Sequence, residues 1–310
     1  MEDIGIWKPL ECIGTSKPGR HWNLEAMKDL DSNNTLEAKD EIEAIEIDLL
    51  LDGIYRRYGY DFRSYASASI RRRIWKFAEQ EGLATISAVQ EAVLHQSSMM
   101  DRFVLSLTVN VTTMFRDPAF FLALRNSVVP ILKTYPMIRI WDAGCATGEE
   151  AYSMAIVLKE EGIYDRCRIY ATDMNEDVLR KAKTGIFPLS HMKEFTDNYI
   201  QSGGKTSFSN YYTAKYDYAI INQELRQNII FAQHNLVTDK SINEFNLVLI
   251  RNVLIYFNED LRAKVLDLLH DSMASFGILA LGKRESLKFS KLESAYEELD
   301  AAMKLYKRCA

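Results

Sequence analysis

The sequence is poor in the residues that most often mark metal sites, disulfide frameworks and membrane spans. Its 310 residues include four cysteines and five histidines, and the cysteines show neither a C-x-x-C pair nor another metal-ligand spacing. No apolar run is long enough to cross a bilayer, and the acidic start MEDIGIW lacks the basic and apolar regions of a signal peptide. We therefore expect a cytoplasmic protein with reduced cysteines, no metal and no direct membrane insertion.

An excess of basic residues is also missing. Lys and Arg number 38 against 43 Asp and Glu, so the formal net charge is −5, which argues against a nucleic-acid partner. Apolar residues make up 47% of the chain, enough for a sizeable core, and the length suits one large domain with a smaller one.

The pattern of the chain changes twice. Residues 1–41 mix Gly, Pro, Ser, Asn and charge without periodicity, which predicts a poorly ordered tail. Residues 42–117 show helical spacing of apolar residues, which predicts a helical N-terminal domain and a linker. Over residues 118–310 strand and helix patterns alternate, which predicts an α/β fold with a mostly parallel sheet. Residues 190–227 are polar and Tyr-rich with a Gly-Gly turn, and we expect a small β insertion there rather than a crossover helix.

Strands are expected where short apolar runs with β-branched residues are bounded by polar ones. The candidates are IRIWDA, RIYATD, NIIFAQHN, FNLVLIRN and GILALG.

The loop WDAGCATGEEAYS, from Trp141 to Ser153, joins the first of these strands to a helix. Its glycines, Gly144 and Gly148, have the spacing G-x-x-x-G and not the G-x-G-x-x-G of dinucleotide sites. Glu149 and Glu150 open the helix, where they would repel a phosphate. S-adenosylmethionine, which carries a sulfonium and an amino group but no phosphate, suits this loop better. The alternative is that both glutamates are ordinary first-turn acids of another α/β protein.

Polar residues also follow the later strands, at the edge of the sheet where ligands bind. Asp173 ends the second strand, where an acid accepts hydrogen bonds from ribose hydroxyls; the alternative is that it caps the next helix. Asn235 and Leu236 follow the next strand and could frame an adenine. Arg251 and Asn252 follow the apolar run LVLI.

Four motifs in order, LTVNVTTMFRD, WDAGCATGEEAYSMA, IYATDMNEDVLRKAKTGIF and IRNVLIYFN, resemble the chemotaxis-receptor methyltransferases, the CheR-type protein-glutamate O-methyltransferases. The resemblance covers about residues 42–310. It implies a Rossmann-like S-adenosylmethionine-dependent methyltransferase domain with a mostly parallel sheet, a small all-helical N-terminal domain and a β insertion.

The resemblance assigns roles residue by residue. It implies that S-adenosyl-L-methionine is bound by Asn110, Thr112, Arg116, Gly144, Glu150, Asp173, Asn235, Leu236, Asn252 and Val253. It makes Tyr256 the active-site tyrosine near the methyl group, and Arg116 the counter-charge for a carboxylate. One departure concerns the insertion, where receptor-tethered members carry a G-x-G loop and this chain has SGGKTSF. Docking of a receptor's terminal peptide is therefore not expected.

The implied activity is methyl transfer from S-adenosylmethionine to glutamate carboxylates of a chemoreceptor cytoplasmic domain. Two alternatives remain open: a methyltransferase of the same fold acting on another protein or small-molecule carboxylate, or a non-catalytic S-adenosylmethionine-binding signalling module. The intact Arg116, Asp173 and Tyr256 weigh against the second.

The segment SIRRRIWKF is a candidate recognition helix. Its apolar residues share one helical face, which places Arg72 and Lys76 opposite and Arg71 and Arg73 at the flanks. This predicts a basic stripe for the acidic helices of a chemoreceptor, and the alternative is an ordinary solvated face.

Overall fold

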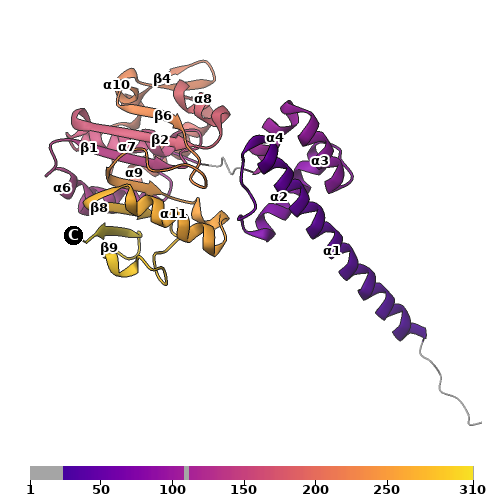
Figure 1. Ribbon diagram of the computed structural model, residues 1–310. Coiled ribbons are helices and arrows are strands. Elements are labelled where there is room, and N and C mark those ends of the chain that lie inside the picture. Colours follow the sequence, from indigo (N-terminus) through magenta and orange to yellow (C-terminus); the bar gives the residue numbers. More distant parts are fainter. Residues whose placement is uncertain (1–23, 108–111, 310) are drawn as a thin grey trace, which may run out of the picture. The chain divides into compact units, whose positions relative to one another are not determined.

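The structure is a computed structural model that describes residues 24–107 and 112–309. The chain divides into two compact units, residues 1–45 and residues 46–310. The second unit therefore holds the helices from residue 46 onward together with the sheet and its insertion (Figure 1). Within the described ranges, no helix has the combination of length and apolar character that crossing a membrane requires.

Four helices make up the N-terminal region: α1 (Leu24–Tyr58), α2 (Ser67–Gln80), α3 (Ile86–His95) and α4 (Ser97–Leu107). Ile70, Ile74 and Phe77 of α2 are buried in a cluster shared with the other helices, as their spacing predicts. The start of α1 differs from the prediction, because the helix begins at Leu24 whereas a poorly ordered tail was expected as far as residue 41. The segment is rich in Ala, Leu, Glu and Lys, which favour helix even without apolar periodicity.

The main sheet has seven strands in the order β6-β2-β1-β7-β8-β10-β9. The strands are β1 (Ile138–Ala143), β2 (Cys167–Asp173), β6 (Ile229–Gln233), β7 (Phe245–Ile250), β8 (Met273–Leu281), β9 (Tyr296–Asp300) and β10 (Leu305–Arg308). From β6 to β8 all neighbours are parallel, and β10 is antiparallel to β8 and to β9. The predicted α/β class with a mostly parallel sheet is confirmed, whereas the terminal hairpin β9–β10 was not predicted.

Both faces of the central strands are buried, as expected for a parallel sheet covered by helices. In β1, Ile138 and Ile140 pack on the face that carries α7 (Glu149–Glu160), whereas Trp141 and Ala143 pack on the face that carries α11 (Glu259–Asp271). Outside the insertion, further α-helices that the structure describes after residue 117 are α5 (Pro118–Ala123), α6 (Val129–Leu132) and α8 (Glu176–Thr184).

The insertion contains a three-stranded antiparallel sheet of order β3-β5-β4, formed by β3 (Ile186–Pro188), β4 (Tyr212–Lys215) and β5 (Tyr218–Ile221). It also contains helices α9 (Met192–Gln201) and α10 (Gln223–Arg226). A small β insertion was predicted over about residues 190–227; the segment contains β4 and β5 of this sheet, and the two helices within it were not predicted. Met192, Phe195 and Tyr199 of α9 are buried at spacings of three and four, a helical pattern that the polar, Tyr-rich composition obscured.

Candidate functional site

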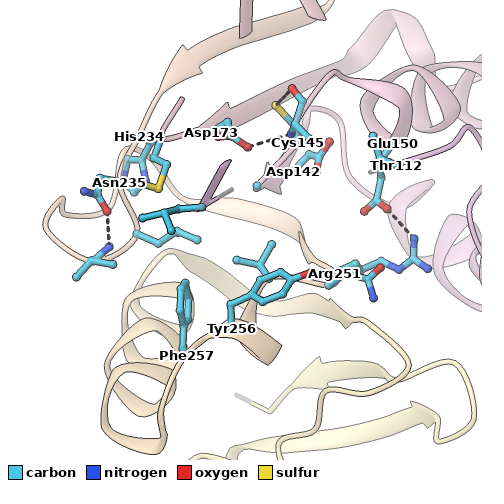
Figure 2. Close-up of a pocket in the computed structure, with 18 of the residues that line it drawn as sticks. Thr112, Asp142, Cys145, Glu150, Asp173, His234, Asn235, Arg251, Tyr256 and Phe257 are labelled. Carbon is cyan, nitrogen blue, oxygen red and sulfur yellow. Dashed lines mark hydrogen bonds and ion pairs between the residues drawn. The ribbon is translucent and has the colours of Figure 1, made fainter. Parts of the chain in front are cut away.

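A pocket lies where β1, β2, β6 and β7 reach the carboxyl edge of the sheet (Figure 2). All the predicted cofactor-binding residues that the structure describes line it: Thr112, Arg116, Gly144, Glu150, Asp173, Asn235, Leu236, Asn252 and Val253. Tyr256 lines it too, and Asn110 lies outside the described residues. The fold thus gathers side chains from four strand ends and from the segment after residue 111 around one space.

The glycine loop approaches its neighbours closely. Gly144 and Gly148 have φ angles of +90° and +91°, in the left-handed region that side chains disfavour. A Cβ atom on Gly144 would lie 2.5 Å from Cγ2 of Val253, so only glycine leaves room for the turn beside the segment that follows β7. The backbone N–H groups of Gly144 and Cys145 both donate to the Thr172 carbonyl, at 2.8 and 2.9 Å, which ties the loop to β2.

Asp173 faces the glycine loop and does not cap α8. Its Oδ2 accepts a hydrogen bond from the backbone N–H of Ala146 at 3.1 Å, and its Oδ1 accepts one from that of Asn175 at 2.9 Å. The cap is Asn175, whose Oδ1 accepts from the backbone N–H groups of Asp177 and Val178. Burial raises the pKa of Asp173, against the effect of these hydrogen bonds. Each carboxylate oxygen keeps lone-pair capacity for a further donor in the pocket.

Arg251 ties the acidic side of the pocket to the segment before α5. Its side chain is only 2% exposed; Nη1 donates to Glu150 Oε2 at 2.6 Å and Nη2 to Asp117 Oδ2 at 2.8 Å. Nη2 also donates to the Arg116 carbonyl at 3.2 Å, and the guanidinium lies 3.9 Å from the centre of the Phe120 ring. The sequence placed Arg251 at the active-site edge but gave it no role. Its contacts show that it orients the Glu150 carboxylate through an ion pair and fixes the backbone of Arg116.

Comparison with protein-family models gives two matches that together span most of the chain. Residues 110–303 match "CheR methyltransferase, SAM binding domain", and residues 45–108 match "CheR methyltransferase, all-alpha domain". The chain belongs to the CheR methyltransferase family. The resemblance drawn from its four motifs is thereby confirmed, and so is its cofactor, S-adenosylmethionine.

Several curated relatives of this CheR-family chain carry methyltransferase names. "Putative methyltransferase Cher3" of Pseudomonas putida is 48% identical over 264 residues, which cover 85% of this chain and 97% of the relative. "Chemotaxis protein methyltransferase" of Listeria innocua is 28% identical and covers 76% of this chain and 87% of its own length. Among solved structures, the N-methyltransferase NodS from Bradyrhizobium japonicum in complex with S-adenosyl-L-homocysteine is 13% identical, with a TM-score of 0.36, over 63% of this chain and 88% of that one. That likeness is too weak to support an argument.

The residues present fit the family's cofactor. Asp142, Glu150 and Asp173 bring three carboxylates to the pocket, and Arg116 and Arg251 bring the cations. Carboxylates suit an amino group, a sulfonium and ribose hydroxyls, and a guanidinium suits the carboxylate of the amino-acid part. The same acids would repel the phosphates of a dinucleotide.

Asp142 is a site residue that the sequence analysis missed. It is 3% exposed, and its Oδ2 has no hydrogen-bond partner in the part of the chain that the structure describes. Burial and the nearby charge of Glu150 raise the pKa of Asp142 well above its ordinary value. A buried acceptor without a donor in the pocket wall is consistent with a positively charged ligand group. The sequence did hold a signal for this residue, because Asp142 is a charged residue inside the apolar strand run IRIWDA, just before the glycine loop.

Glu285 is a second residue that was missed. Its buried carboxylate accepts hydrogen bonds from the backbone N–H groups of Asn252, Val253 and Leu254 at 3.1, 2.9 and 2.8 Å, and from that of Gly282 at 2.6 Å. Burial raises its pKa, and these bonds act in the opposite direction. Glu285 therefore shapes the turn after β7, where Asn252 adopts a φ of +63°.

The segment around Tyr256 is held by the helical region. The Tyr256 carbonyl accepts a hydrogen bond from the backbone N–H of Ala66 at 2.9 Å. The guanidinium of Arg73 lies 4.4 Å from the centre of the Tyr256 ring and donates to the Leu107 carbonyl. Tyr256 is thus contacted from α2 as well as from the sheet.

The basic residues of α2 divide into two groups. Arg71, Arg72 and Lys76 are exposed, as predicted for a basic stripe, whereas Arg73 is 8% exposed. The prediction that Arg73 lies at the flank of the stripe is therefore wrong. Its contacts with Tyr256 and Leu107 draw it inward, and the helical period alone does not show such tertiary contacts.

Proposed function

We propose that this CheR-family methyltransferase methylates glutamate side-chain carboxylates in the cytoplasmic domain of a chemoreceptor, giving glutamyl methyl esters and S-adenosylhomocysteine. The observation that carries the proposal is the match to both parts of the family, because the all-alpha part supplies an exposed basic face beside the cofactor-binding part. Relatives named chemotaxis protein methyltransferase in Listeria innocua and Pseudomonas aeruginosa support a role in chemotaxis. Such a substrate places the enzyme in the cytoplasm.

The proposed cofactor contacts follow the family pattern and the pocket geometry. Asp173 accepts hydrogen bonds from the ribose hydroxyls, since both of its oxygens have remaining capacity. Glu150 holds the amino group and Arg116 the carboxylate of the amino-acid part. The adenine and the methyl donor are framed by Asn235, Leu236, Asn252 and Val253, and Asn110 and Thr112 complete the pocket.

The chemistry needs orientation more than proton transfer. When bound, S-adenosylmethionine supplies a methyl group on a sulfonium, a good leaving group. The methyl–sulfur bond breaks as a carboxylate oxygen–carbon bond forms, and the negative and positive charges cancel without movement of a proton. A free glutamate has a pKa of about 4.3, so it is already ionised at neutral pH and needs no general base. The protein's part is to align and partly desolvate it, for which Arg116 offers a counter-charge and Tyr256 a hydroxyl donor.

Recognition of the receptor is assigned to the exposed face of α2. Arg72 and Lys76, with Arg71 beside them, present positive charge that complements glutamate-bearing receptor helices. Arg73 is removed from this surface because it is buried against Tyr256.

The loop SGGKTSF of the insertion is not proposed as a tether. The Glu160 carboxylate accepts hydrogen bonds from the backbone N–H of Lys205 and from the Tyr211 hydroxyl, both at 2.9 Å, and also from the Tyr199 hydroxyl. A Cβ on Gly204 would lie 2.3 Å from the Tyr199 ring. These contacts hold Gly204 and Lys205 against α7 and α9, and together with the missing G-x-G pattern they support recognition by α2 rather than by the insertion.

The test is transfer of labelled methyl groups to purified receptor cytoplasmic domains. We expect label in the receptor that base releases as methanol, because carboxylate esters hydrolyse in base. Base-stable label would indicate another acceptor atom. Label in small molecules or in other proteins alone would favour a different carboxylate substrate, and cofactor binding without transfer would favour a non-catalytic module.

A further inference from the structure

Tyr65, in the segment between α1 and α2, lines the cofactor pocket. It pairs with Phe257 in an antiparallel β-bridge, in which Ala66 donates to the Tyr256 carbonyl at 2.9 Å and Asn258 donates to the Ser64 carbonyl at 3.0 Å. The Tyr65 ring packs edge-on to the rings of Phe257 and Phe62, with centroids 5.1 and 5.3 Å away. Backbone and ring contacts therefore fix this side chain in the wall of the pocket.

The hydroxyl of Tyr65 has a poor partner for such a well-fixed group. Across residues 24–107 and 112–309, its recorded hydrogen bond goes to Met174 Sδ at 3.8 Å. A thioether sulfur is a weak acceptor. A tyrosine hydroxyl is protonated at neutral pH and can donate, and burial and the negative charge of Asp173 raise the pKa of Tyr65 further. Tyr65 is half-buried, and a tyrosine hydroxyl that faces a protein interior normally finds a strong acceptor; among the described residues it has only this sulfur.

We propose that Tyr65 is a cofactor-binding residue contributed by the helical region, whose hydroxyl donates to an acceptor atom of the adenosine part of S-adenosylmethionine. The position next to Met174 and Asp173 selects the adenosine part. Asp173 offers only acceptors to that part, and Tyr65 adds the donor that a ring nitrogen or ribose oxygen can use. The inference rests on the cofactor and not on the identity of the methyl acceptor.

The segment that contains Tyr65 also connects the pocket to α2. Tyr65 and Ala66 immediately precede α2, which begins at Ser67, and Ala66 holds the carbonyl of Tyr256. A cofactor bound by Tyr65 therefore stabilises the segment that leads into α2 and that holds the Tyr256 carbonyl.

The experiment is calorimetric titration of Tyr65→Phe with S-adenosylhomocysteine and with 5′-methylthioadenosine, which keeps the adenosine and lacks the amino-acid part. Loss of one neutral hydrogen bond predicts roughly three- to tenfold weaker binding. The loss should be equal for the two ligands, because both contain the adenosine. The melting temperature should hold, because the ring contacts with Phe257 and Phe62 remain.

Tyr60→Phe is the matched control, since it makes the same change in the same segment at a tyrosine that does not line this pocket. It should bind both ligands as the parent does. Parent-like binding by a folded Tyr65→Phe would overturn the proposal and leave Tyr65 as a packing residue. A loss confined to S-adenosylhomocysteine would also overturn it, because the contact would then lie in the amino-acid part.

Discussion

The guanidinium of Arg73 lies 4.4 Å from the centre of the Tyr256 ring, within the range of a cation–π contact. One residue belongs to the second helix of the helical region and the other follows a strand of the sheet. This contact connects the part of the chain that we assign to receptor recognition with the residue that we assign to methyl transfer.

Replacement of Arg73 by Met should lower both stability and turnover. The variant loses the cation over Tyr256 and leaves the buried Leu107 carbonyl without its donor, which should cost about 1–3 kcal/mol of the free energy of unfolding. Denaturant unfolding and methyl transfer at saturating cofactor measure the two effects. Arg72→Met, at the exposed neighbour, should leave stability close to that of the parent. Equal behaviour of the two variants would contradict a structural role for Arg73.

Substitutions at Asp173 and at Asn175 should distinguish cofactor binding from helix capping. Asp173→Ala removes a charged acceptor, worth about 1.5–3 kcal/mol, and should weaken S-adenosylmethionine binding by roughly ten- to a hundredfold. Asn175→Ala removes the cap of α8 and should cost about 1 kcal/mol of stability while affinity changes little. Calorimetry and thermal unfolding of both variants supply the comparison. Unchanged affinity in a folded Asp173→Ala would remove Asp173 from the cofactor site.

Charge reversal on α2 should reduce receptor methylation without affecting the cofactor. We expect Arg72→Glu with Lys76→Glu to methylate receptor domains poorly at low salt and to bind S-adenosylmethionine as the parent does. The difference should shrink as salt rises, because exposed charges are screened over about 8–10 Å near physiological ionic strength. Lys240→Glu with Lys288→Glu makes the same change in net charge at exposed positions outside α2. If both pairs methylate equally well, the basic face is an ordinary solvated surface.

Removal of the receptor's terminal peptide should change methylation little. A large loss of methylation would show that the insertion acts as a tether.

Glu149 should make stability fall as pH rises. Burial, partly offset by a hydrogen bond from Thr147, raises its pKa from 4.5 to about 7. Between these values the unfolded chain releases a proton that the folded chain keeps, so the free energy of unfolding decreases with pH in this window and levels off above about 7. Glu149→Gln stays neutral and should lack this decrease, with a gain over the parent of up to about 3 kcal/mol at pH 8.

Urea unfolding of the parent and of Glu149→Gln from pH 4.5 to 8 measures the difference directly. Glu297→Gln, at an exposed position on β9, controls for loss of a glutamate in general. A constant difference between the parent and Glu149→Gln across this range would show that Glu149 is not held protonated by the fold.

Much of the site could be anticipated because strand ends are visible in the sequence. Asp173 and Asn252 each follow an apolar run, and the carboxyl ends of parallel strands meet at one edge. The inward position of Arg73 could not be read from the helical period, which places it at a flank and says nothing of Tyr256. Glu285 carries little local signal either, since three of its four backbone N–H partners belong to residues more than 30 positions earlier.

In the fold, too, elements with a clear local sequence pattern were predicted, and elements that depend on tertiary contacts were not. The central strands are buried on both faces, so their apolar runs are long and distinct. The edge hairpin β9–β10 is rich in charged residues and half exposed, and its strand character comes from pairing with β8. Helix α9 was hidden by its polar composition, although its buried residues follow the helical repeat.

Methyl transfer by the parent and by Tyr256→Phe, measured side by side with labelled S-adenosylmethionine and a receptor cytoplasmic domain, tests the central claim most directly. The account predicts base-labile label on receptor glutamates with the parent, and a lower turnover with Tyr256→Phe at nearly equal affinity for S-adenosylhomocysteine, because only an orienting hydroxyl is lost. Base-stable label, or equal turnover by the two proteins, would contradict it.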